Sequence, residues 1–217
     1  MFKLDFSNSR NSSLRLLCVG AHSDDIEIGC GATVLRLLEE YSNIEVCWVV
    51  FGSGEQRGSE ARESARLFLE EAKQKKIVIL SFRDSFFPYI GTEIKEFFET
   101  LKHDFSPDLI FTHYRNDLHQ DHRLISELTW NTFRDHFILE YEIVKYDGDL
   151  GAPNFFVHLD EDICQKKINI IMKCFSTQGS RNWFTADAFL SILRLRGVES
   201  NAPQRYAEGF YCRKIIF

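Results

Sequence analysis

The sequence predicts an α/β fold with a mainly parallel central sheet. Two observations carry this prediction: strand-like apolar runs alternate with amphipathic helix-like segments, and the clearest runs are β-branched and aromatic, as in strands buried on both faces. Such an order of strands and helices implies parallel pairing with right-handed crossovers. No repeat, low-complexity tract or linker divides the 217 residues, so we expect one domain over residues 1–217.

Four strand–helix units are expected in the first two thirds of the chain. Apolar runs predict strands at 14–21, 44–51, 77–82 and 107–113. Apolar residues at helical spacing predict helices at 27–40, 59–73, 92–102 and 121–134, the second of them after a glycine-rich loop at 52–58. The last third is less regular. There we expect strands at 137–146 and 155–159, helices at 161–174 and 186–196, and a final edge strand at 208–217.

The composition argues against several classes of protein. A net charge of -6 disfavours nucleic acid as a partner, because binding phosphates requires a basic surface. No apolar run reaches the roughly 18 residues of a spanning helix, and the polar segment 1–13 lacks the apolar core of a secretory signal. The six cysteines form no C-x-x-C pair, which indicates reduced thiols. We expect a cytoplasmic protein without a transmembrane segment, either monomeric or a homo-oligomer.

His22, Asp24 and Asp25 directly follow the first predicted strand, in the segment VGAHSDDIEIGCG at 19–31. In open parallel sheets, ligands bind beyond the carboxyl ends of the strands. Neighbouring carboxylates repel each other and are costly to desolvate, so this triplet indicates a cation or a chemical role. The alternative is a solvated turn in which Asp24 or Asp25 caps the next helix.

A second polar cluster follows the fourth predicted strand, in the segment THYRNDLHQDHR at 112–123. Its potential ligands are His113, Asp117, His119, Asp121 and His122. Because the carboxyl ends of parallel strands meet at one edge of a sheet, the two clusters can converge on a metal ion. Imidazole and carboxylate ligands without thiolate favour zinc, with Fe2+, Co2+ or manganese as alternatives.

The motifs A-H-S-D-D, G-C-G and H-x-D-H-R together resemble the PIG-L/LmbE-like superfamily of zinc-dependent N-deacetylases, related to GlcNAc-PI de-N-acetylase. The resemblance runs from residue 14 to the segment 206–210. Ser23 replaces the usual proline and Ala32 the usual second glycine, and neither change removes a metal-binding atom. The resemblance implies a Rossmann-like three-layer fold. It also implies removal of an N-acyl group, usually acetyl, from an amino sugar or a conjugated or nucleotide-linked amino sugar, in bacterial polysaccharide or glycoconjugate biosynthesis.

The resemblance also implies roles for individual residues. Asp24 is expected to act as the general base, and His119, if cationic, to stabilise the oxyanion. Asp121 is expected to orient an imidazole, with His119 as the favoured partner. Either Asp24 or His119 could return the proton to the departing amine, and the sequence does not decide between them. The three expected zinc ligands are His22, Asp25 and His122.

The expected substrate contacts are Arg62, which resembles a substrate-binding position of the family, and Tyr141 and Tyr146, whose rings could stack on a sugar. A solvated helix face and an ordinary strand with a polar turn are the alternatives. Other functions also fit the sequence. These are a metal-dependent amidase or esterase acting on a non-sugar substrate, a non-catalytic sugar-binding protein with a residual metal site, and a dinucleotide-binding module. The last lacks a G-x-G-x-x-G motif after the first strand.

Overall fold

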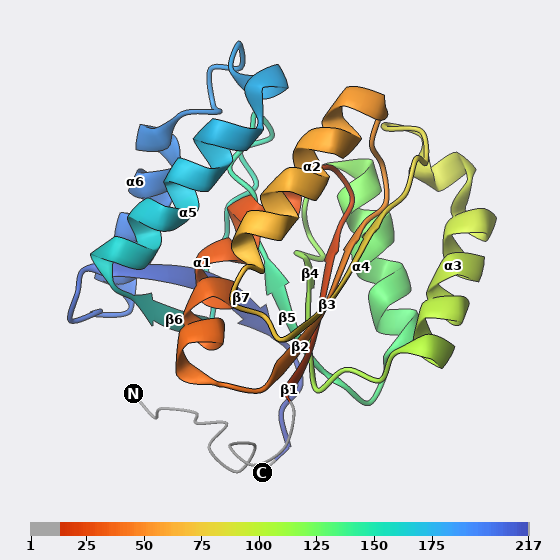
Figure 1. The fold of residues 1–217 in the computed structure, drawn as a ribbon, viewed down its shortest axis with the longest axis horizontal. Helices are drawn as coiled ribbons and strands as arrows, with labels where there is room; N and C mark the ends of the chain where they lie inside the picture. The colour runs from red at the N-terminus through yellow and green to blue at the C-terminus, as the bar shows by residue number, and fades with distance from the viewer. Residues whose placement is uncertain (1–13, 217) are drawn as a thin grey trace.

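A seven-stranded sheet forms the centre of the computed structural model, which describes residues 14–216 (Figure 1). Its strand order is β3-β2-β1-β4-β5-β7-β6. The first five of these strands pair in parallel, whereas β7 is antiparallel to both of its neighbours. The strands are β1 (Leu14–Gly20), β2 (Ile44–Val50), β3 (Gln74–Ile79), β4 (Leu109–His113), β5 (Phe137–Tyr141), β6 (Phe155–Leu159) and β7 (Tyr206–Cys212).

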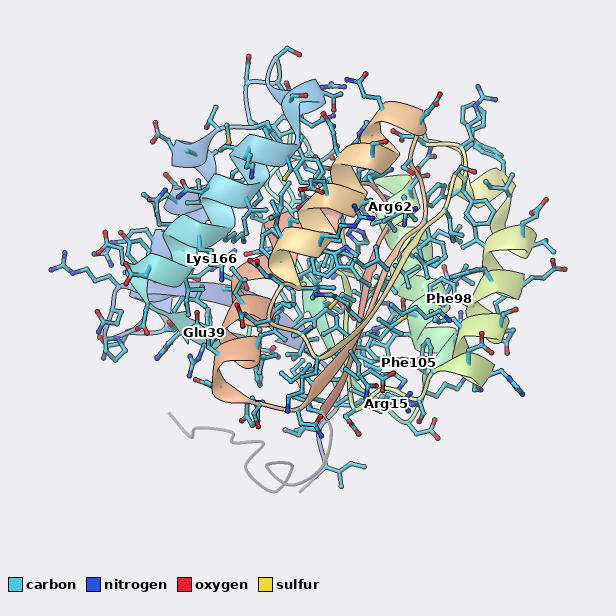
Figure 2. All side chains as sticks on the ribbon, in the orientation of Figure 1. Arg15, Glu39, Arg62, Phe98, Phe105 and Lys166 are labelled. Atoms are coloured by element: carbon cyan, nitrogen blue, oxygen red, sulfur yellow. The ribbon has the colours of Figure 1, made fainter. Side chains whose placement is uncertain are left out.

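Helices cover both faces of this sheet and make a three-layer α/β fold (Figure 1). The helices are α1 (Asp25–Glu40), α2 (Glu55–Phe68), α3 (Gly91–Asp104), α4 (Gln120–Thr132), α5 (Glu161–Cys174) and α6 (Ala186–Glu199), with short 3-10 turns η2 (Phe87–Tyr89) and η3 (Ser176–Gln178). One apolar core joins α1, α2, α5 and α6 to the sheet. A second core, which includes Phe98 and Phe105, joins α3 and α4 to the opposite face (Figure 2). The predicted fold class is confirmed.

The final strand differs from its prediction, because β7 lies between β5 and β6 and not at the sheet edge. Glu208 is a charged residue of this strand. In the structure it is buried, where its carboxylate binds Lys167 at 2.7 Å and accepts the N–H groups of Ala32 and Thr33 at 3.0 and 2.7 Å. A buried charge with these partners is compatible with an inner strand. Phe217, the end of the predicted strand, is outside the described residues.

Other element boundaries also differ from the sequence prediction: α2 and β3 end earlier, at Phe68 and Ile79, and α6 ends later, at Glu199. The edge strand β3 starts at Gln74, since exposed polar side chains are tolerated at an edge. The helix α2 starts at Glu55, because Gly58, which suggested a loop, is helical. Strand β5 ends at Tyr141, and the predicted continuation to residue 146 is a loop.

Two expectations from composition can be compared with the described residues. Within 14–216, no helix is long and apolar enough to span a bilayer. The six cysteines, all in this range, are free thiols, and five of them are buried. The segment 1–13, from which the absence of a signal sequence was predicted, is outside the described residues.

Candidate metal centre

Three side chains from two strand-to-helix connections meet at the carboxyl edge of the sheet. His22 follows β1, Asp25 is the first residue of α1, and His122 lies in the first turn of α4. His22 Nδ1 lies 3.1 Å from His122 Nε2 and 3.4 Å from Asp25 Oδ2. The Asp25 Oδ2–His122 Nε2 distance is 3.5 Å. The structure therefore brings together the three residues that the sequence predicted as ligands.

These separations fit a zinc ion. Zinc binds nitrogen and carboxylate oxygen at about 2.0–2.2 Å in tetrahedral geometry, which places its ligand atoms about 3.3 Å from one another. The three side chains are buried, and their two imidazoles and one carboxylate are the usual ligand types of a catalytic zinc site. Two further histidines lie near these ligands. His119 forms a group with His22 and His122, and His113 forms one with Asp25 and His122; within each group the potential ligand atoms lie within 4.8 Å of one another.

Carboxylates behind the two ligand histidines orient the rings. The Nδ1–H group of His122 donates to Asp117 Oδ2 at 2.9 Å, which leaves its Nε2 lone pair directed at the centre. The Nε2 atom of His22 lies 3.2 Å from both Asp121 Oδ2 and Asp84 Oδ1, and its Nδ1 faces the centre. Asp121 thus orients His22 and not His119, the partner that the sequence favoured. The Asp121 carboxylate is itself held by backbone N–H groups of the loop after β3.

The ionisation states of the ligand groups also suit a cation. Burial alone would raise the pKa of Asp25, but His122, His113 and His22 hold it well below its usual range. Burial and the neighbouring His113 lower the pKa of His122 to about 4, so this ring is neutral at pH 7. Burial would also lower the pKa of His22, but nearby carboxylates, Asp25 first, outweigh it and raise that pKa well above its ordinary value. A metal ion must therefore displace a proton from His22.

Asp24 directly precedes the potential ligand Asp25 and does not cap α1. It occupies the N-cap position, but its side chain makes no capping hydrogen bond. Its Oδ1 accepts from Arg57 Nη2 at 3.0 Å, and its buried Oδ2 has no partner among the described residues. Burial and the Asp25 carboxylate raise the pKa of Asp24 to about 6, against the opposing effect of Arg57. A carboxylate with a free oxygen and a raised pKa is suited to accept a proton.

His119 lies at the mouth of the centre, with its ring 4.8 Å from that of His22. Its Nδ1 accepts the backbone N–H of Asp121 at 3.3 Å, so in the neutral ring Nε2 carries the proton. Burial and the charge of His22 lower the pKa of His119. This shift opposes the cationic state considered from the sequence and favours a neutral hydrogen-bond donor.

The three expected substrate contacts lie in different environments. Arg62 projects from α2 beside a groove of about 540 Å³ that 79–81 also line (Figure 2). Tyr141 is fully buried, and its hydroxyl donates to the Val19 carbonyl at 2.6 Å. Tyr146 is largely exposed, on the loop after β5. Arg57, in the first turn of α2, is the arginine that contacts Asp24.

Three further residues lie at the centre: His113, which the sequence offered as a potential ligand, and Asp84 and Lys145, for which it predicted no role. Asp84 follows β3 at the carboxyl edge, so the rule that identified the first two clusters would also have found it. His113, the last residue of β4, accepts the Ala21 N–H at 2.9 Å and stacks on His122 with a centroid distance of 3.9 Å. Lys145 lies 3.1 Å from Asp117 but far from it in sequence, and no motif signals that contact.

Comparison with known proteins identifies the family of this chain. Residues 17–133, more than half of the chain, match the PIG-L family, described as GlcNAc-PI de-N-acetylase. The chain belongs to the PIG-L family. The match contains both polar clusters, and the resemblance noted in the sequence is confirmed.

Similar proteins are found both by sequence and, over most of the chain, by fold. The uncharacterized deacetylase YaiS of Escherichia coli K12 is 29% identical over 121 residues, which are 53% of this chain and 65% of YaiS. The chain thus matches slightly less than two thirds of that relative. The conserved protein TT1542 from Thermus thermophilus has a TM-score of 0.74 at 21% identity, covering 94% and 96% of the two chains. The N,N'-diacetylchitobiose deacetylase of Pyrococcus horikoshii, complexed with its inhibitor MPG, has a TM-score of 0.69 at 23% identity and coverage of 96% and 87%.

Proposed function

We propose that this protein is a zinc-dependent N-deacetylase that hydrolyses the acetamido group of an amino sugar. The observation that carries the proposal is the Asp24 carboxylate, on the residue before the potential ligand Asp25, whose buried Oδ2 has no partner within residues 14–216. Asp25 itself converges with His22 and His122. The description of its family as GlcNAc-PI de-N-acetylase supports the same reaction. His22, Asp25 and His122 would hold the zinc ion, which when bound lowers the pKa of water and polarises a carbonyl group. Fe2+ and Co2+ suit the same donors.

Asp24 is the general base of the proposed reaction. Arg57 holds Oδ1, and Oδ2 remains to take a proton from the attacking water. The water oxygen forms a bond to the amide carbon, the C–N bond then breaks, and acetic acid and a free amine result. The acid then loses its proton to solvent and becomes acetate. The proton on Asp24 passes to the departing nitrogen, which regenerates the carboxylate. His119, as a neutral Nε2–H donor, stabilises the charge that develops on the carbonyl oxygen.

The substrate class rests on the relatives of the chain. The family is described by a de-N-acetylase of a GlcNAc conjugate, and a structural neighbour is a deacetylase of N,N'-diacetylchitobiose. We therefore propose an N-acetylated amino sugar, either conjugated or nucleotide-linked. Bacterial polysaccharide or glycoconjugate biosynthesis in the cytoplasm is the setting we propose for it.

Acetate release from N-acetylglucosamine, its glycosides and its nucleotide-linked form tests this function in the zinc-loaded protein. The Asp24→Asn variant should bind as much zinc as the wild type, but its turnover rate should be lower by roughly 100-fold or more, because the substitution removes a general base. Asp160→Asn is the control, since this exposed aspartate has no capping hydrogen bond.

Other results of these assays would change the proposed role of Asp24 or the proposed function. Unchanged turnover in Asp24→Asn would remove that residue from the base role. Hydrolysis of esters or other amides without any N-acyl sugar would favour the amidase or esterase alternative. A zinc-loaded protein that binds amino sugars without hydrolysing them would be a binding protein.

A further inference from the structure

Large apolar side chains are exposed on three loops at the carboxyl edge of the sheet. These loops follow β3, β4 and β5, the strands that lead into Asp84, Asp117 and Lys145. Of the ten large apolar side chains exposed within 14–216, five lie in these loops. We name them the apolar rim, with the exposed fractions Phe86 37%, Tyr89 77%, Leu118 58%, Tyr146 65% and Leu150 41%.

The first part of the apolar rim is fixed directly to the metal centre. Phe86 lies between Ser85 and Phe87, whose backbone N–H groups donate to the Asp121 carboxylate at 2.6 and 3.2 Å. That carboxylate also contacts His22. The Phe86 ring is therefore held close to a proposed metal ligand. The Arg83 guanidinium lies over this ring, 3.5 Å from its centroid, and the Tyr89 ring lies 5.9 Å away.

The second part of the apolar rim is joined to the same centre from the other side. Asp117, which orients His122, binds Lys145 at 3.1 Å. Lys145 also binds Asp149, and the Asp149 carboxylate accepts the backbone N–H of the residue after Asp117 at 2.7 Å. The exposed side chains next to these bonded residues are Leu118, Tyr146 and Leu150.

A bare amino sugar would cover little of this surface. Its hydroxyl groups prefer polar partners, whereas exposed apolar patches next to a site indicate an apolar ligand. A lipid bilayer fits less well, because the same loops carry the exposed carboxylates of Asp84 and Asp147 and the chain has a net charge of -6.

We propose that the substrate carries an apolar group beside its amino sugar, an alkyl chain or an aromatic ring that rests on the apolar rim. This inference rests on the proposed N-deacetylase function and narrows its substrate class. The acetamido group would reach the metal centre while the apolar aglycone lies across the loops after β3, β4 and β5. Each CH2 group that is fully buried strengthens binding about fourfold, so partial burial of a chain can decide which substrate is used.

The test compares the methyl and octyl glycosides of N-acetylglucosamine as substrates of the zinc-loaded protein, below the micelle concentration of the octyl compound. We expect kcat/KM to be roughly tenfold or more higher for the octyl glycoside, from burial of part of its chain. The double variant Tyr89→Ser, Tyr146→Ser should bring this ratio close to one. Val198→Ser is the matched control, because Val198 is equally exposed but lies on α6, and it should leave the ratio unchanged.

Equal kcat/KM values for the two glycosides would overturn the apolar rim as a substrate surface while the N-deacetylase function stands. A preference for octyl that survives in the double variant would do the same. Release of acetate from neither glycoside, nor from any other N-acetyl sugar, would instead count against the proposed function and remove the basis of this inference. Calorimetry with both glycosides on the Asp24→Asn protein reads the binding preference without turnover.

Discussion

Asp117→Asn is the change that most directly probes how the centre is built. The Asp117 carboxylate accepts three groups: Oδ2 takes the His122 Nδ1–H at 2.9 Å and the Lys145 ammonium at 3.1 Å, and Oδ1 takes the His119 backbone N–H at 2.7 Å. Asparagine keeps the shape, but it offers one acceptor and one donor in place of two acceptors.

Neither orientation of the amide satisfies the site. If the amide oxygen faces His122, the NH2 group meets the backbone N–H of His119, and two donors oppose each other. If the amide is reversed, the NH2 group faces His122 Nδ1 and moves the ring proton to Nε2, where the metal-binding lone pair should be. Loss of such a partner typically weakens metal binding 10–100-fold, or about 1.4–2.8 kcal/mol.

Competition with a chromophoric chelator at constant pH measures the zinc dissociation constant of each variant. Asp147→Asn is the control, since that carboxylate contacts the same Lys145 at 3.9 Å and, within residues 14–216, no histidine. Zinc affinity equal to wild type in Asp117→Asn would refute the proposed role of Asp117. An equal loss in both variants would show that charge around Lys145 matters and that the His122 hydrogen bond does not.

Three further outcomes are expected. The pKa of His22 is raised, so zinc must displace one proton from this ring, and zinc affinity should fall about tenfold for each pH unit below that pKa. A zinc affinity that does not change with pH in chelator titrations would contradict this. Gly29→Ala should destabilise the fold by about 1–3 kcal/mol in denaturant unfolding, because a Cβ there would lie 2.1 Å from the Tyr141 ring; Gly54→Ala, with open space around it, should be nearly neutral. Lys167→Met should lower the free energy of unfolding by about 3–5 kcal/mol, since it leaves the buried Glu208 charge without its cation. A decrease below 1 kcal/mol would show that other groups neutralise that charge.

Much of the centre was predictable from the sequence because its ligands are close to strand ends. His22 and Asp25 follow one parallel strand and His122 follows another, and the topology of an open sheet brings such ends together. The division of work between the two adjacent aspartates came from family resemblance. In the structure Asp25 Oδ2 faces both histidines. Asp24 binds Arg57 through Oδ1, and its Oδ2 has no partner in the part of the chain that the structure describes.

The sequence by itself determined the fold class, most of the elements and the composition of the proposed metal centre. These depend on local apolar periodicity and on short motifs at the ends of strands. Only the tertiary structure decided which carboxylate orients which histidine, since Asp121 reaches His22 across 99 residues and Lys145 reaches Asp117 from another loop. The inner strand β7 likewise has a distant partner, because Lys167 of α5 binds its buried Glu208 carboxylate at 2.7 Å. Contacts between residues far apart in the chain leave no local pattern, and the packing of the layers alone determines them.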